Sequence, residues 1–260
     1  MKIATWNVNS IRTRLEQVTN WLGDNSVDVL CLQETKVIDK DFPRSAFEEL
    51  NYHVYCYGQK SYNGVAMISR QQLQDVTTGF CSVLSNIDTF WDEQKRAIAG
   101  KVGDITVVNL YVPNGSAIGS EKYEYKLGWL KILQEYLHQQ LDSNSAICVC
   151  GDFNIALEDK DIHDDVNPEN HIMSSETERQ VLQEILSLGF ADAFRKFTSS
   201  RGQYSWWDYR AASFRRNRGW RIDHLYLTPK LYERAQSCII DTAPRKLTKP
   251  SDHAPVILEL

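Results

Sequence analysis

The chain has 260 residues, of which 42% are hydrophobic and 24% charged, a composition typical of a soluble globular protein with an ample core. No apolar run approaches the roughly 20 residues that a membrane-spanning helix needs, and the start, MKIATWNVNS, resembles a short strand rather than a signal peptide, so we expect a cytoplasmic protein with no membrane partner. The formal net charge of −5, averaged over the chain, argues against a nucleic-acid partner.

Strand-like runs alternate with helical patterns along the whole chain. Short apolar runs predict strands at 2–6, 27–33, 52–56, 65–69, 105–112, 146–150, 222–227 and 256–260. Apolar residues at helical spacing predict helices through 11–22 and 130–141. A capping box at Ser175 and Glu178 predicts a third helix, which Gly189 would end. We expect one α/β domain over residues 1–260, with helices covering the sheets.

Six cysteines raise the question of disulfides or a metal site. Cys31, Cys148 and Cys150 lie in apolar runs, where small buried thiols are expected. No second Cys/His pair at zinc spacing accompanies Cys148 and Cys150, which disfavours a zinc site.

The charge is unevenly distributed. Residues 201–221 hold six Arg and one Asp, a local charge of +5, so the remainder carries −10. The same segment contains six aromatic residues. We call residues 201–221 the basic aromatic segment. Its composition suits a nucleic-acid contact better than the average charge does.

Several predicted strands end in acidic or hydrogen-bonding residues. Asp152 and Asn154 follow the run ICVC, and the two-residue period of a strand places both on one face. Similar positions are held by Asn7, Asn9, Glu34, Tyr111, Asn114, Asp223, Asp252 and His253. Each alone is an ordinary turn or strand-end residue. Their recurrence indicates a functional site, because sites gather at strand and loop ends in α/β folds.

These residue types favour one chemistry. Glu34, Asp152 and Asp252 offer hard oxygen ligands, which suit Mg²⁺ or Mn²⁺ better than zinc. His253 beside an acid such as Asp223 could be an oriented donor to an oxyanion. No Ser-His-Asp or Cys-His arrangement and no Gly-rich phosphate loop stands out. Hydrolysis of a phosphate ester by metal-activated water fits this inventory.

The chain resembles the exonuclease III family of Mg²⁺-dependent nucleases, which includes the abasic-site endonucleases. The matching stretches, in order over nearly the whole chain, are ATWNVNSIR, LCLQETK, GQKSYNGVAMISR, NLYVPNG, GDFNIA, YSWWDYR, GWRIDHLYL and PSDHAPV. GDFN and SDH are shared with a wider superfamily of phosphatases and phosphodiesterases, whereas WWDYR and GWRID point to its DNA-repair branch. The resemblance implies a four-layer α/β sandwich of two packed mixed β-sheets flanked by helices.

The resemblance also implies a metal site for Mg²⁺, with Mn²⁺ as a substitute. Glu34 is the expected principal ligand, with Asn7 and Asp252 beside it. An alternative second site consists of Asp152, Asn154 and His253. The resemblance allows one metal ion or two. It also allows either Asp152 or His253 as the general base.

By the same resemblance, the strand-end residues have catalytic roles. Asp152 is expected to orient or deprotonate the attacking water, and Asn154 to hold the phosphate or that water. Tyr111 is expected to contact the scissile phosphate or the leaving group. His253, oriented by Asp223, is expected to stabilise the developing charge.

The expected DNA contacts come largely from the basic aromatic segment. Its arginines can neutralise phosphates, and its tryptophans can stack on a sugar or a base. The residues assigned to DNA binding are Asn114, Trp206, Trp207, Arg215, Arg216 and Trp220. The alternative is that Trp206 and Trp207 belong to the core and the arginines to a solvated loop.

One segment departs from the family pattern. Many abasic endonucleases of this family carry small residues and then an aromatic residue and Leu-Pro, where this chain has His171, Ile172 and Met173. Bulk at His171 would hinder an internal abasic site, while a 3′ nucleotide or 3′ phosphate could still enter. His171 is therefore a candidate substrate gate.

The resemblance and the residues together predict a monomeric Mg²⁺-dependent DNA-repair nuclease. It would act on duplex DNA with 3′ ends, nicks or abasic sites, as a 3′→5′ exonuclease and 3′-end processing enzyme with abasic endonuclease activity. One alternative is a related phosphodiesterase acting on RNA or a small phosphoester. Another is a catalytically inactive nucleic-acid-binding scaffold.

Overall fold

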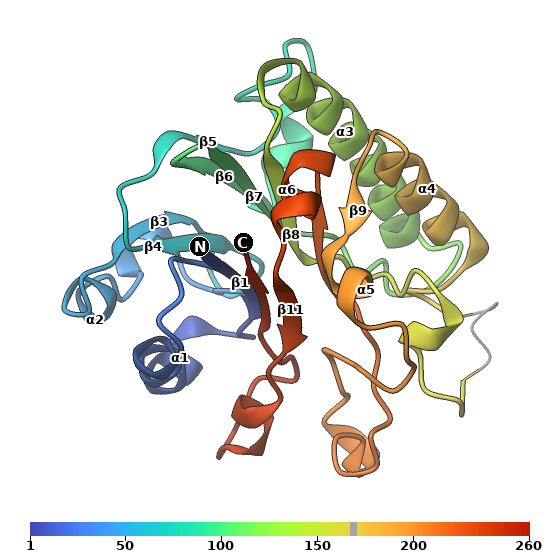
Figure 1. Cartoon of the computed structure of the whole chain (residues 1–260). Coiled ribbons are helices and arrows are strands. Elements are labelled where there is room, and N and C mark those ends of the chain that lie inside the picture. The colour runs from blue at the N-terminus through green and yellow to red at the C-terminus, as the bar shows by residue number, and fades with distance from the viewer. Residues whose placement is uncertain (167–170) are drawn as a thin grey trace.

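The computed structural model describes residues 1–166 and 171–260, which fold into two β-sheets packed face to face (Figure 1). The described strands of the first sheet run in the order β11 (Ser237–Ile240), β12 (Val256–Glu259), β1 (Lys2–Asn7), β2 (Val29–Gln33), β4 (Val65–Ser69) and β3 (His53–Tyr57). Those of the second run β5 (Gln74–Thr78), β6 (Ala97–Val102), β7 (Ile105–Tyr111), β8 (Ile147–Asp152), β10 (Asp223–Leu227) and β9 (Ala191–Asp192).

Both sheets are mixed. One parallel pair lies in each, β1 with β2 and β7 with β8, and antiparallel neighbours surround it. The parallel pairs matter for function because they bring the carboxyl ends of four strands to one edge of the molecule.

Helices cover the outer faces and complete four layers. The helices α1 (Ile11–Asn25) and α2 (Ser45–Glu48) pack on the first sheet, and α3 (Glu121–Ser143) and α4 (Glu176–Leu186) on the second (Figure 1). Two shorter helices, α5 (Ala193–Phe197) and α6 (Pro229–Arg234), lie beside β10. The expected four-layer α/β sandwich is confirmed. None of the described helices is long and apolar enough to cross a membrane.

Three hydrophobic clusters correspond to the three interfaces between these layers. Inward-facing residues such as Val29, Met67 and Val107 fill the space between the sheets, together with the buried free thiols of Cys31 and Cys148. Cys150 is free and buried in the same cluster, so the expectation of small buried thiols is confirmed for Cys31, Cys148 and Cys150. Other clusters join α1 to the first sheet and α3 and α4 to the second.

The predicted strands are all present, with ends that differ by at most two residues, and the three predicted helices are present too. The capping box is formed: the Ser175 side chain accepts from the Glu178 amide, and Glu178 accepts from the Ser175 amide. The sequence pattern missed β5, β6, β9 and β11. The edge strand β5 is mostly exposed, and β6 contains Ala and Gly, so neither shows a strong strand pattern.

Candidate active site

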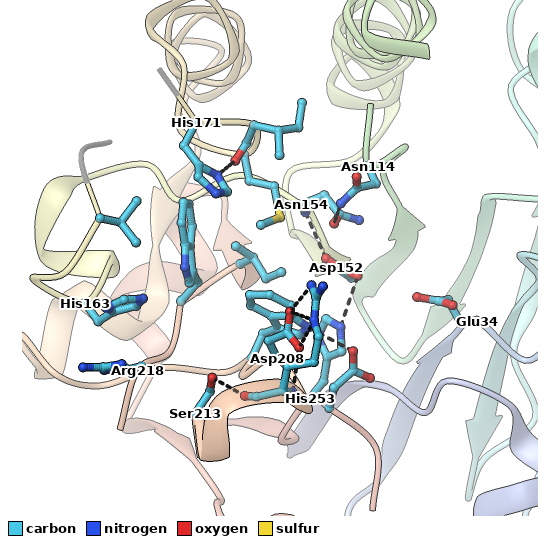
Figure 2. A pocket seen from close by; sticks show the side chains of 18 of the residues that line it. Glu34, Asn114, Asp152, Asn154, His163, His171, Asp208, Ser213, Arg218 and His253 are labelled. Carbon is cyan, nitrogen blue, oxygen red and sulfur yellow. Dashed lines mark hydrogen bonds and ion pairs between the residues drawn. The ribbon is translucent and has the colours of Figure 1, made fainter. Parts of the chain in front are cut away.

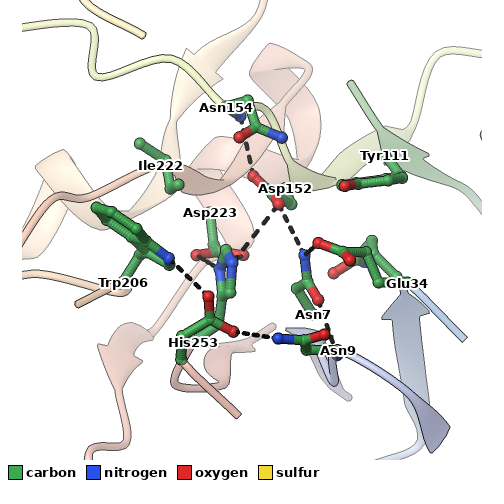
Figure 3. A network of polar contacts seen from close by, with 12 residues as sticks. Asn7, Asn9, Glu34, Tyr111, Asp152, Asn154, Trp206, Ile222, Asp223 and His253 are labelled. Carbon is green, nitrogen blue, oxygen red and sulfur yellow. Dashed lines mark hydrogen bonds and ion pairs between the residues drawn. The ribbon is translucent and has the colours of Figure 1, made fainter. Parts of the chain in front are cut away.

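Strand ends from both sheets converge on one cleft (Figure 3). Asn7 ends β1, Tyr111 ends β7 and Asp152 ends β8, while Glu34 directly follows β2. Because β10 runs antiparallel to β8, its first residue, Asp223, pairs directly with Asp152. His253 lies in the loop before β12. Residues far apart in sequence therefore meet at one edge.

Asn7 links the two carboxylates on opposite sheets. Its side-chain nitrogen donates to Glu34 Oε1 and to Asp152 Oδ2, each at 2.8 Å. Its side-chain oxygen accepts from the Asn9 amide at 3.0 Å. The sequence predicted Asn7 as a metal ligand. In this arrangement its nitrogen faces the carboxylates, so Asn7 orients Glu34 and Asp152 relative to each other.

His253 lies between two carboxylates, which decides its charge. Its Nδ1 is 2.9 Å from Asp223 Oδ2, and its Nε2 is 3.7 Å from Asp152 Oδ2. Burial favours the neutral ring, but the carboxylates of Asp223 and Asp152 outweigh burial and raise the pKa of His253. Burial raises the pKa of Asp152, and the charge of Asp223 adds to this effect, although His253 opposes it. A protonated imidazole thus faces the cleft next to Asp152.

The Glu34 carboxylate is partly exposed, unlike the buried carboxylates of Asp152 and Asp223. Its Oε2 lies 2.8 Å from the Lys36 ammonium, which in turn donates to Asn9 Oδ1 at 2.5 Å. Burial opposes ionisation of Glu34, but Lys36 and Asn7 outweigh it and lower the pKa of this carboxyl. A negatively charged oxygen that already attracts a cation suits a metal ligand.

The donor set of the cleft fits a divalent metal ion. Ligand atoms of Glu34, Asp152 and His253 lie within 4.8 Å of one another. Two of the three are carboxylates, the hard oxygen ligands that Mg²⁺ and Mn²⁺ prefer, whereas a protonated His253 has no lone pair to offer a metal ion. This group combines Glu34 from the first predicted site with two residues of the alternative second site.

Asp252 lines the same cavity as Glu34 and Asp152, and its carboxylate is held by two hydrogen bonds. It is not part of that three-residue group; its Oδ1 accepts from Asn9 and its Oδ2 from the Trp206 indole, both at 3.0 Å. In this structure Asp252 therefore joins the cleft to the basic aromatic segment.

Tyr111 forms one wall of the cleft. Burial, and next the nearby charge of Glu34, raise the pKa of Tyr111 well above its ordinary value, so the phenol keeps its proton. The Arg96 guanidinium lies 4.6 Å from the centre of its ring and donates to its backbone carbonyl. Arg96 thereby fixes the Tyr111 ring.

Asn154 and Asn114 form a pair beside Asp152. Asn114 Nδ2 donates to Asn154 Oδ1 at 2.9 Å, and the Asn154 amide donates to Asp152 Oδ1 at 2.9 Å. Asn154 adopts a left-handed backbone conformation with φ of 49°. This turn brings its side chain back toward the cleft.

A cavity of about 520 Å³ opens next to these residues (Figure 2). Glu34, Asp152 and His253 line one part of it, and Trp206, Trp220 and His171 line another. The His171 ring lies against the Trp220 ring, with centroids 4.7 Å apart. Ile172 and Met173 complete this apolar wall. A charged catalytic end and an aromatic end thus share one space.

The basic aromatic segment divides into exposed and buried parts. Arg215 and Arg216 are exposed and make no ion pair with the described residues. Arg221 is buried instead and pairs with Asp161 and Asp192. Trp207 is only 2% exposed and packs with Tyr204 and Ala254. The placement of the Trp207 ring on a DNA-facing surface is therefore wrong, because the ring belongs to the core.

Sequence reasoning missed several residues that shape the cleft. Lys36 was visible in the QETK stretch, although nothing local indicated its contact with Asn9. Arg96 and the buried Lys126, which donates to the Asn154 carbonyl, carried no sequence signal. Each acts across elements that are distant in sequence.

Comparisons with known proteins agree with this geometry. The model of the Endonuclease/Exonuclease/phosphatase family matches residues 4–253. Exodeoxyribonuclease III of Haemophilus influenzae is 35% identical over 271 residues, covering 100% of this chain and 99% of the relative. The structure of an AP endonuclease from Archaeoglobus fulgidus aligns with this one at a TM-score of 0.94 and 42% sequence identity, and the alignment covers 100% of this chain and 99% of that chain. The NExo 3′ phosphatase from Neisseria, bound to a product DNA hairpin, has a TM-score of 0.94 and 40% identity, with coverage of 100% and 99%.

The family match covers nearly the whole chain, and each of these relatives is covered almost to its full length. Their shared fold is the four-layer sandwich whose strand ends form the cleft. The chain therefore belongs to the Endonuclease/Exonuclease/phosphatase family and is a nuclease of its exodeoxyribonuclease III and AP endonuclease branch.

Proposed function

We propose that this nuclease repairs the 3′ ends of duplex DNA, removing 3′ phosphates and 3′ nucleotides, and that it also incises DNA at abasic sites. The observation that carries the proposal is the single cavity with a carboxylate–imidazole end and an aromatic end (Figure 2). A scissile phosphate fits the first end, and an unstacked sugar or base fits the second. The names of the Neisseria and Archaeoglobus relatives support both activities.

We assign Mg²⁺ as the metal, with Mn²⁺ as a substitute. Glu34 and Asp152 would hold it through carboxylate oxygens, and the Asn7 amide orients both. When bound, such an ion polarises the phosphate and acidifies a water molecule.

The remaining roles follow from charge and position. His253 is kept protonated by Asp223, so its Nε2 can donate to a phosphate oxygen that gains negative charge. The protonated imidazole cannot accept a proton, which leaves Asp152 to orient the attacking water and take its proton. Tyr111 and Asn154 line the same space and supply neutral donors to the phosphate or the leaving group.

DNA binding would use the exposed part of the basic aromatic segment. Trp206 and Trp220 line the cavity, where they can stack on the sugar or base. Arg215 and Arg216 are free to neutralise phosphates. Asn114 lines the same cavity. Trp207 supports the segment from the core.

His171 would select among substrates. Its ring packs against Trp220 at an interplanar angle of 44°, and its Nδ1 lies 2.6 Å from the Ile172 carbonyl oxygen, so it occupies the aromatic end of the cavity in a fixed position. A 3′ phosphate or a terminal nucleotide requires less room there than an abasic site within a continuous strand. We therefore propose that 3′-end processing exceeds internal incision.

Two labelled duplexes test the proposed function. One carries an internal abasic-site analogue, and the other a recessed 3′ end blocked by phosphate; each is incubated with Mg²⁺, with Mn²⁺ and with EDTA. We expect metal-dependent removal of the 3′ phosphate and slower internal incision, with Asp152→Asn as the inactive control. Inactivity on both duplexes would refute the proposal, and activity on RNA or a small phosphoester would then identify the related phosphodiesterase.

A further inference from the structure

A buried ion pair lies directly behind the cavity wall. Lys126 on α3 and Glu178 on α4 form a salt bridge in which both side chains are 0% exposed. Removing two charges from water costs several kcal/mol per ion, and apolar residues of similar volume often pack with equal or greater stability. The geometry around this pair therefore requires an explanation other than stability.

Lys126 connects the two loops that carry the asparagine pair. Its ammonium donates to the Asn154 carbonyl at 2.8 Å and to the Asn114 carbonyl at 3.3 Å, in addition to Glu178. An ammonium has three protons, so its donors are fully used. On the cavity side, the side chains of Asn114 and Asn154 bond to each other. The two loops are thus held together both at their backbones and at their side chains.

Glu178 holds the opposite rim of the cavity. Its Oε1 accepts from the Met173 amide at 3.1 Å, and its Oε2 accepts from the Ser175 amide at 3.1 Å and the Ser175 hydroxyl at 2.6 Å. Met173 has a left-handed backbone conformation with φ of 73°. Non-glycine residues keep such conformations where surrounding contacts over-determine them.

We propose that Lys126 and Glu178 are positioning residues for the nuclease reaction. Lys126, through its bonds to two backbone carbonyls, sets where the side-chain amides of Asn154 and Asn114 lie. Glu178, through its bonds to Met173 and Ser175, sets how closely the rim that carries His171 and Met173 approaches those amides. The inference rests on the proposed function, because it assigns the phosphate to the Asn154 side of the cavity. Neither residue lines the cavity, so neither is placed in contact with the substrate.

The test replaces the pair by neutral residues of similar size, Lys126→Met with Glu178→Gln. Neutralising both charges together avoids an unpaired buried charge. On the duplex with a blocked 3′ phosphate, we expect kcat to fall at least tenfold while KM stays within threefold, because the outer DNA-binding surface is unchanged. Hydrogen exchange of backbone amides should accelerate at residues 112–116 and 153–156.

The matched control is Leu137→Ala, a buried position on the same helix α3 in the core beneath the second sheet. It should lower Tm yet leave kcat within twofold and exchange in those two segments unchanged. If the double variant folds and keeps kcat within twofold, or if Leu137→Ala loses as much kcat, the pair has only a structural role and the inference is wrong.

Two further outcomes are separable. If the double variant does not fold, Lys126→Gln with Glu178→Gln retains hydrogen-bonding side chains and is measured against the same expectations. If the unsubstituted protein acts on no DNA probe, the proposed function fails, while the exchange measurement still tests whether the pair positions the two loops. If hydrogen exchange at residues 112–116 and 153–156 is unchanged in the double variant, that result alone contradicts a positioning role for the pair.

Discussion

Asp152, Asp223 and His253 show how the charge of single residues depends on their neighbours. Asp152 and Asp223 are directly opposite each other on antiparallel strands, and the His253 ring contacts both carboxylates. Asp152 is 1% exposed and His253 4% exposed, so little water screens these charges. The two carboxyl groups keep the imidazole protonated, while burial, with the charge of Asp223 adding to it, raises the pKa of Asp152 to about 7.

Asp152→Asn and His253→Ala test the two ends of this arrangement. Loss of a general base typically lowers the rate ~10²–10⁴-fold, and we expect this for Asp152→Asn. Loss of an oxyanion donor typically costs ~10²–10³-fold in kcat, and we expect this for His253→Ala. Single-turnover kinetics on the 3′-phosphate duplex measures the loss, and circular dichroism checks folding. Near-normal turnover by either folded variant would overturn its assignment.

His171→Gly tests the gate at the aromatic end of the cavity. Removing the imidazole from the Trp220 ring enlarges this end, so internal incision at an abasic site should rise at least fivefold relative to removal of a 3′ phosphate. His138→Gly, at an exposed position on α3, is the control for a general effect of losing a histidine. An unchanged ratio of the two activities for His171→Gly would show that this side chain does not limit entry.

At the scale of elements, the basic aromatic segment is held to the catalytic loop by several contacts. The Trp206 indole donates to Asp252, and the Trp207 amide donates to the Asp252 carbonyl at 3.0 Å. The Arg245 guanidinium lies over the rings of Trp207 and Phe214. The buried part of the segment thus fixes the position of its exposed part.

Arg215→Ala with Arg216→Ala tests the exposed part. Each phosphate contact contributes about 0.9 to the slope of log K against log salt, so loss of two contacts should reduce the slope by roughly 2 and weaken DNA binding. Binding titrations at several salt concentrations measure this. The matched control is Lys230→Ala with Arg234→Ala on α6. Asp223 is the first residue of β10 and lies at the cleft, whereas α6 follows the other end of that strand. An unchanged slope would remove Arg215 and Arg216 from the binding surface.

At the scale of the whole molecule, a second buried network joins the segment after β8 to β9, at the edge of the second sheet. Arg221 pairs with Asp161 and with Asp192 of β9, and its Nη1 lies 3.0 Å from His224 Nδ1. The His224 Nε2 lies 2.8 Å from the Ile155 carbonyl oxygen. Burial, with the charge of Arg221 adding to it, lowers the pKa of His224 to about 4. His224 is therefore neutral, donates to Ile155 and accepts from Arg221.

This network predicts how stability depends on pH. Between pH 6.5 and 4 the unfolded chain binds a proton at His224 that the folded protein does not, so the free energy of unfolding falls as pH decreases, by up to roughly 3 kcal/mol from this group. His224→Gln keeps hydrogen-bonding groups but does not titrate, so urea unfolding should show a shallower fall over this range. The exposed His138→Gln should keep the parent slope. A parent-like slope for His224→Gln would contradict the assignment.

The sequence by itself determined eight of the described strands and three helices and, through the family resemblance, the four-layer fold and most of the predicted site residues that line the cleft. Strand and helix periodicities are local, and Glu34, Asp152, Asp223 and His253 stand at strand ends or in the loops beside them that periodicity locates. Motifs such as QETK, GDFN and SDHAP add the family resemblance, which the family match confirms.

Only the tertiary structure decided the neighbours of each side chain, which differ even between residues of the same type. Trp206 and Trp207 are adjacent and chemically alike, yet one lines the cavity and the other fills the core. Arg215 is exposed while Arg221 is buried against two carboxylates. The Lys126–Glu178 pair joins residues 52 positions apart. Burial, pairing and pKa depend on contacts between distant segments, and no local pattern encodes those contacts.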